Sequence, residues 1–168
     1  PKGIGALALG PNIEVEAQLL GGGQEEKRRA GTENIVGAVG FAETCSIVRK
    51  DTDEMDRVTS LRDQFENSLK AKVSKVEIFG SQSPRIGNTS CVRLPGKTSD
   101  MQVIAFDLAG VAVSAGSACS SGKVSGSHVL KAMGVHTTAA NESVRFSIGW
   151  GTTKKDIEVA VKTWLNLY

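Results

Sequence analysis

The chain has 168 residues, of which 40% are hydrophobic and 23% charged, a composition typical of a globular protein with one core or one core plus part of another. The net charge of +2 at pH 7 is too small to indicate a nucleic-acid-binding surface. No apolar run approaches the roughly 20 residues that span a membrane, so we expect neither nucleic acid nor a membrane as a partner.

Residues 1–34 are rich in glycine and irregular in pattern. Short strands are predicted at 4–9 and 13–17, before a glycine run that breaks any regular element. Thr32 follows a cluster of basic residues at the start of a helical pattern, a setting that suits a phosphate group. A solvated charge run is the alternative interpretation. Because the chain starts at Pro1 within a strand-and-turn pattern, we expect it to be part of a longer protein.

From residue 35 to about 73, apolar residues recur at spacings of three and four, which predicts a helix with one apolar face. A cap or kink between two helices is predicted at 51–53. On the solvent side we expect the ion pairs Asp53–Arg57 and Glu66–Lys70. The apolar face consists of Met55, Val58, Leu61, Phe65, Leu69 and Val73.

Short strands and helices alternate after residue 75, which predicts an α+β domain with helices that cover a small sheet. Ser99 and Gln102 have the spacing of a capping box, and the helix they open should stop at Gly110. A short helix over 128–133 should end at the next glycine. Thr153 and Asp156 form a second capping box. Strands are predicted at 76–79, 88–94, 111–114 and 144–150.

The three cysteines are far apart and form no C-x-x-C pair, which argues against a zinc site and favours a reducing compartment. Cys45 and Cys91 are predicted to be small buried hydrophobes within a helix and a strand. Cys119 differs because it lies within 113–127, a loop of glycine, serine and alanine that could carry a thiol between two partners. An incidental cysteine on a flexible loop is the alternative.

Arg145 lies on the alternating strand 144–148. If Val144, Phe146 and Ile148 face the core, the guanidinium faces the other side, where it could hold a carboxylate by two hydrogen bonds. An ordinary outward-facing arginine is the alternative. Neither histidine has an acid or thiol at motif spacing, so no catalytic role and no metal site are predicted.

Together, four segments resemble the cysteine desulfurases, pyridoxal-phosphate enzymes of the class V aminotransferase group. Residues 1–7 look like the strand just past the family's Schiff-base lysine. Residues 21–34 resemble its glycine-rich stretch and R-x-G-T-x-N turn. Residues 114–122, followed by residues 127–130, are similar to its active-cysteine loop, in the long form of the branch whose loop is mobile. Residues 144–149 look like its substrate-carboxylate strand.

The resemblance implies an α/β fold, the C-terminal part of a fold-type I pyridoxal-phosphate transferase. Residues 1–34 would be the tail of the large cofactor-binding domain, residues 35–74 a connecting helix, and residues 75–168 the small α+β domain. The family's lysine lies before the P-K-G turn, and Lys2 does not occupy its place. We therefore expect the isolated chain to be inactive.

The complete enzyme would convert L-cysteine to L-alanine and leave a persulfide on Cys119. The resemblance gives Arg145 the substrate carboxylate, and Thr32 the phosphate of pyridoxal phosphate in the neighbouring subunit of a homodimer. An acceptor, such as an iron–sulfur scaffold protein, would take the sulfur for cluster or thio-cofactor assembly, in the cytoplasm or, if the source is eukaryotic, in the mitochondrial matrix. The alternatives are another class V aminotransferase, a selenocysteine lyase, or a stand-alone sulfur-carrier or partner-binding module.

Overall fold

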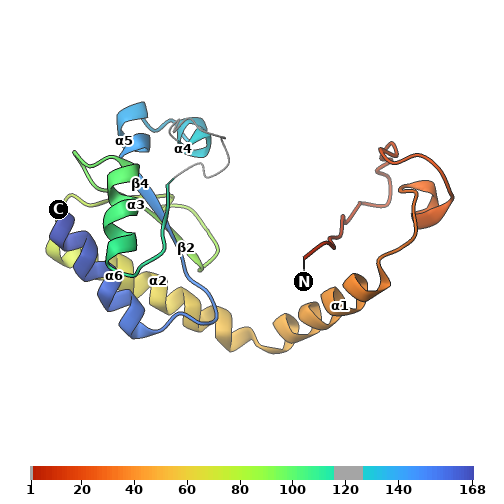
Figure 1. Ribbon diagram of the computed structural model, residues 1–168, viewed down its shortest axis with the longest axis horizontal. Helices are drawn as coiled ribbons and strands as arrows, with labels where there is room; N and C mark the ends of the chain where they lie inside the picture. The colour runs from red at the N-terminus through yellow and green to blue at the C-terminus, as the bar shows by residue number, and fades with distance from the viewer. Residues whose placement is uncertain (1, 116–126) are drawn as a thin grey trace. The chain divides into compact units, whose positions relative to one another are not determined.

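The computed structural model describes residues 2–115 and 127–168, apart from the side chain of Thr52 (Figure 1). The chain divides into two compact units, residues 1–52 and residues 53–168.

The first unit contains little regular structure before its long helix. The segment η1, Gln24–Lys27, is a tight turn whose last three residues have positive φ, and α1 spans Ile35–Lys50. The strands predicted at 4–9 and 13–17 are wrong. A strand requires a neighbour to take up its backbone hydrogen bonds, and the described part of this unit supplies none.

Asn34 starts α1 and ties an earlier segment to it. Its Oδ1 accepts a hydrogen bond from the Gly37 N–H at 3.0 Å, which satisfies one of the free donors at the helix start. Its Nδ2 donates to the Gly3 carbonyl at 3.2 Å. A Cβ at Gly37 would lie 3.1 Å from the Cβ of Ile4, so a residue without a side chain allows this close approach.

Two helices, not one, follow residue 34. Between α1 and α2 (Thr52–Lys72), Asp51 adopts a non-helical conformation with φ −105° and ψ 68°. The break predicted at 51–53 is therefore confirmed.

The second unit is built on a four-stranded antiparallel sheet in the order β1-β2-β4-β3. Only the last residue of the strand predicted at 111–114 pairs with the sheet. The strands predicted at 76–79 and 88–94 are confirmed with shorter bounds, and the strand predicted at 144–150 spans 143–147 instead. The strands are β1 (Glu77–Phe79), β2 (Thr89–Arg93), β3 (Ser114–Ala115) and β4 (Ser143–Ser147). The remaining helices are α3 (Ser99–Leu108), α4 (His128–Ala132), α5 (Thr137–Asn141) and α6 (Lys154–Leu167).

Helices α2, α3 and α6 pack on one face of this sheet and form the core (Figure 1). Phe65 of α2 and Phe106 of α3 both contact the ring of Phe146 in β4, with ring centroids 4.6 and 5.2 Å apart. Burial of each such side chain contributes about 2 kcal/mol. The apolar face predicted for α2 is confirmed, except that Met55 is 42% exposed.

The helix ends follow the predicted signals with one correction. The capping box of Thr153 and Asp156 is present at α6, and Gly110, with φ +75°, follows the end of α3. The cap of α3, however, is Thr98 and not Ser99. The amide of Gln102 donates instead to two backbone carbonyls, so it does not close a capping box.

The predicted solvent-side pair Glu66–Lys70 is wrong. Glu66 is 3% exposed and accepts hydrogen bonds from Arg85 at 2.7 Å and Ser90 at 2.8 Å. Burial raises the pKa of the Glu66 carboxyl, but these hydrogen bonds outweigh it and hold the pKa below its ordinary value. A helical spacing rule considers only partners on the same helix, whereas these two come from the loop after β1 and from β2.

Arg57 also pairs differently from the prediction. Its guanidinium binds Glu54 at 2.6 Å, one turn back, and not Asp53. It also donates to the carbonyls of Trp150 and Thr152 at 2.9 and 2.8 Å. Arg57 therefore fixes the loop between β4 and α6 to the start of α2.

Candidate functional site

The sheet has two chemically different faces. Side chains that alternate with the core residues point away from the apolar face, and most are polar. We call this surface the Arg145 face. It consists of Glu77, Phe79, Thr89, Cys91, Arg93, Ser114, Ser143, Arg145 and Ser147.

Arg145 lies near the middle of this face, in β4. Its neighbours Val144 and Phe146 are buried while Arg145 itself is exposed, so the predicted orientation of the guanidinium is confirmed. The residue directly opposite on β2 is Cys91, and the residue opposite on β3 is Ser114. In an antiparallel pair, side chains at opposed positions share a face with Cβ atoms about 5 Å apart.

Among the described residues, Arg145 has no ion-pair partner, and this distinguishes it from the other arginines of the second unit. Each of those binds a carboxylate: Arg57 binds Glu54, Arg62 binds Asp63, Arg85 binds Glu66, and Arg93 binds Glu77 and Glu142. An exposed guanidinium without a counter-ion can accept a carboxylate from a ligand in a bidentate pair.

Cys91 is half-buried beside Arg145. Burial raises the pKa of its thiol to about 11, against the opposing effect of the Arg145 charge. The thiol is therefore neutral at physiological pH and a poor nucleophile. The prediction that Cys91 lies in a strand is confirmed, and the prediction that Cys45 is buried is wrong because Cys45 is exposed on α1.

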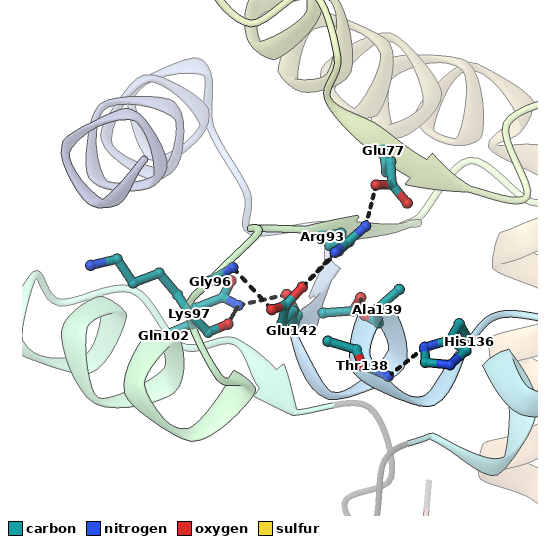
Figure 2. Close-up of polar contacts among 10 residues, drawn as sticks. Glu77, Arg93, Gly96, Lys97, Gln102, His136, Thr138, Ala139 and Glu142 are labelled. Carbon is teal, nitrogen blue, oxygen red and sulfur yellow. Dashed lines mark hydrogen bonds and ion pairs between the residues drawn. The ribbon is translucent and has the colours of Figure 1, made fainter.

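At one end of the Arg145 face, Arg93 forms a polar cluster with two carboxylates. Figure 2 shows the guanidinium of Arg93 between the carboxylates of Glu77 and Glu142. Arg93 Nε donates to Glu142 at 2.8 Å, and the Gly96 N–H donates to the same carboxylate at 3.0 Å. Burial alone would raise the pKa of the Glu142 carboxyl, but these hydrogen bonds hold it below its ordinary value.

This cluster connects separate elements of the second unit, and its two carboxylates neutralise the charge of Arg93. The side-chain amide of Gln102, from α3, donates to the Glu142 carbonyl at 2.7 Å and to the Lys97 carbonyl at 2.9 Å (Figure 2). The backbone N–H of Leu94 also donates to the Glu142 carbonyl, at 2.9 Å. The cluster thus holds β2, α3 and the start of β4 in one arrangement.

Thr32, the predicted phosphate-binding residue, belongs to the first unit and is exposed on the turn before α1. Arg29 shapes this turn because it donates to the Gly31 carbonyl at 2.7 Å and pairs with Glu25 at 3.5 Å. Gly31 has φ +98°, a conformation that favours glycine. An exposed hydroxyl one turn before the N-terminus of α1 is compatible with the phosphate of pyridoxal phosphate.

Cys119, the predicted nucleophile, lies outside the described residues. The chain on either side of that gap ends at β3, where Ser114 is opposite Arg145, and at Ser127, the N-cap of α4. The described members of the predicted site, Thr32 and Arg145, belong to different units.

Sequence reasoning identified Arg145 but missed its two neighbours on the sheet. The sequence predicts that Cys91 is a buried core residue, and it indicates no role for Ser114. The alternation along β2 would have placed Cys91 on the same face as Arg93, but the register with β4 is not visible in the sequence. In the described ranges, no group of three metal-ligating side chains is present, and no helix is long and apolar enough to cross a membrane.

Comparison with known proteins gives consistent results. The model of the family "Aminotransferase class-V" matches residues 1–159. A cysteine desulfurase of Klebsiella pneumoniae is 37% identical over 163 residues, which are 97% of this chain and 41% of that protein. A cysteine desulfurase of Cereibacter sphaeroides is 39% identical over 158 residues, 94% of this chain and 40% of that protein.

A comparison with solved structures identifies the same family. A NifS-like protein from Rickettsia africae matches with a TM-score of 0.79 and 30% identity, over 94% of this chain and 41% of that one. The resemblance to cysteine desulfurases and the mixed α/β fold are thereby confirmed. The chain spans about two fifths of the length of the relatives it matches.

Proposed function

The chain belongs to the class V aminotransferase family, whose members use pyridoxal phosphate, and on this basis we propose that it is part of a cysteine desulfurase. The complete protein converts L-cysteine to L-alanine and passes the sulfur to an acceptor protein, such as an iron–sulfur scaffold, in the cytoplasm or the mitochondrial matrix. The observation that carries this proposal is Arg145, an exposed guanidinium without an ion-pair partner in the described residues, on the strand where the resemblance expects the substrate carboxylate.

Three residues of this chain have separate tasks in the proposed reaction. Arg145 binds the carboxylate of L-cysteine and so orients the substrate. The hydroxyl of Thr32 binds the cofactor phosphate of the neighbouring subunit in a homodimer. The thiolate of Cys119 takes the sulfur atom of the substrate, so that a persulfide remains on Cys119 and L-alanine is released. Pyridoxal phosphate, when bound, supplies the electron sink for this chemistry.

The first unit supports the proposal that the chain acts within a larger assembly. Several of its large hydrophobic side chains are more than half exposed, and a stable protein covers an apolar surface of this extent. The remaining three fifths of a relative's length and a second subunit are the proposed cover. The most exposed are Leu7 at 75%, Leu20 at 85%, Ile35 at 69%, Val36 at 86% and Val39 at 65%.

Replacement of Cys119 tests the reaction in a full-length protein that contains this chain. Cys119→Ala should abolish persulfide formation from L-cysteine, measured by alkylation and mass spectrometry together with alanine release. Cys45→Ala is the matched control, because that thiol lies on α1 and has no proposed task. An aminotransferase would keep its activity in Cys119→Ala, and a selenocysteine lyase would prefer selenocysteine to L-cysteine; either result contradicts the proposal.

The isolated chain separates the enzyme from a stand-alone sulfur carrier. We expect no visible absorption band of bound pyridoxal phosphate and no turnover with the 168-residue chain alone. Persulfide uptake by Cys119 of the isolated chain from a donor protein, at a rate like that of the complete protein, would favour the carrier.

A further inference from the structure

Among the described residues Arg145 has no counter-ion, and the residues that face it across the sheet explain this. The opposed positions on both neighbouring strands, Cys91 and Ser114, carry uncharged side chains. On the same face, Arg93 is opposite Glu77 on β1 and near Glu142, and it binds both carboxylates. The two arginines thus lie on the same face of one sheet, but a carboxylate is opposite Arg93 and only uncharged side chains are opposite Arg145.

A carboxylate at either position opposite Arg145 would bind it. Opposed Cβ atoms in an antiparallel pair are about 5 Å apart, which is within reach of an Arg–carboxylate pair. A substrate loses translational freedom when its carboxylate binds Arg145, whereas a carboxylate within the chain does not. The internal carboxylate would therefore compete strongly with the substrate for Arg145. The uncharged neighbours therefore have a functional consequence in addition to their packing.

We propose that Cys91 and Ser114 are specificity-determining residues: as uncharged cross-strand neighbours of Arg145 they leave its guanidinium free, so that the site selects substrates with a free carboxylate. This inference rests on the proposed role of Arg145 in substrate binding. It extends that role to two residues that act through Arg145 and need not contact the substrate.

The protonation state of Cys91 is consistent with this role. Burial raises the pKa of its thiol to about 11, so a thiolate that would pair with Arg145 does not form at physiological pH. The hydroxyl of Ser114 carries no charge at any physiological pH. Neither neighbour therefore supplies a negative charge.

The kinetic test places a carboxylate beside Arg145 in the full-length protein loaded with its cofactor. Cys91→Asp should raise the KM for L-cysteine about 10- to 100-fold, which corresponds to the loss of a charged hydrogen-bonded contact. The KM for L-cysteine methyl ester, which has no free carboxylate, should rise much less, so the preference for the acid should fall by a similar factor. Ser60→Asp adds the same charge on the exposed side of α2 and is the matched control.

A second measurement needs no cofactor and uses the 168-residue chain with Cys45 and Cys119 replaced by alanine. Cys91 is then the single thiol, and its alkylation by anionic iodoacetate is compared with that by neutral iodoacetamide. A free Arg145 should favour iodoacetate, and both Arg145→Gln and Ser114→Asp should lower the ratio of the two rates about 3- to 10-fold at low salt. The ratio is independent of the thiol pKa, because both reagents consume the same thiolate.

The outcomes separate the two proposals. If Arg145→Gln leaves the KM for L-cysteine unchanged, the role of Arg145 in the proposed function is wrong. If Arg145→Gln raises the KM for L-cysteine, but Cys91→Asp leaves the preference for the acid unchanged and Ser114→Asp leaves the alkylation ratio unchanged, the role of the neighbours is wrong and that of Arg145 stands. If Cys91→Asp does not fold, Ser114→Asp in the alkylation assay decides the inference.

Discussion

Arg93 and Arg145 occupy the same face of one antiparallel sheet, yet their surroundings differ completely. Arg93 is held by carboxylates from β1 and from the residue between α5 and β4 (Figure 2), whereas Arg145 has a thiol and a hydroxyl opposite it. The first arrangement fixes strands and loops in place, and the second leaves a charge available to a ligand. The difference teaches that the cross-strand partners, and not the residue type, decide whether an arginine on this face is paired with a carboxylate or left without one among the described residues.

The sharpest way to test this comparison is to remove the free guanidinium. In the full-length protein, Arg145→Gln should raise the KM for L-cysteine about 100-fold, because a bidentate charged contact with the substrate is lost. The free energy of unfolding should change by less than about 0.5 kcal/mol, since Arg145 has no ion-pair partner among the described residues. Steady-state kinetics and urea denaturation measure the two quantities. A large loss of stability with an unchanged KM would reverse the assignment.

For Arg93, which is paired with two carboxylates, we expect a loss of stability and little change in KM. Arg93→Gln should lower the free energy of unfolding by about 2 kcal/mol, because Glu77 and the largely buried Glu142 lose their counter-ion. Urea denaturation of the 168-residue chain measures this effect. The KM for L-cysteine in the folded full-length variant should stay within about threefold of the parent, well below the change expected from Arg145→Gln. If both substitutions affected KM alike, the contrast between the two sites would be lost.

The smallest expected effect concerns pH. The pKa of Glu142 is lower in the folded chain than its ordinary value, so its carboxylate stabilises the fold above the ordinary carboxyl pKa. That stabilisation is lost as the pH falls through the folded-state pKa. Glu142→Gln should lower the unfolding free energy by about 1 kcal/mol at pH 6 and show a shallower decline between pH 6 and pH 3.

Arg145→Gln is the control for the pH experiment because it removes a positive charge from the same face without removing a carboxylate partner. Its unfolding free energy should decline with falling pH along the slope of the parent chain. An equal slope in the parent and in Glu142→Gln would mean that the carboxylate does not stabilise the folded state.

Local signals predicted much of the fold. The apolar spacing of α2, the glycine stop after α3 and the capping box of α6 all depend on residues within one or two turns of each other, and each is confirmed. The strands expected at 4–9 and 13–17 failed because a strand depends on a neighbour that its own residues do not reveal. The short helix α5, which precedes β4, was not predicted at all.

For the candidate site, as for the fold, the sequence predicted the local features and missed the contacts between distant residues. Alternation along β4 was sufficient to orient Arg145, and motif resemblance was sufficient to indicate the enzyme family. The pairing of Glu66 with Arg85 and Ser90 was missed because those residues are distant in the sequence. The position of Cys91 opposite Arg145 was missed for the same reason, since a sequence shows that a residue lies in a strand but not which residue stands opposite it.

The order of residues in this chain is thus enough to establish its helices, their ends and its family, because these depend on short-range periodicity and on motifs. Only the folded sheet determines which charges meet, because register brings together residues some 50 positions apart, such as Arg93 with Glu142 and Cys91 with Arg145. Electrostatic interactions act through space and fall off with distance, so whether an arginine is neutralised or left free is decided by the tertiary structure.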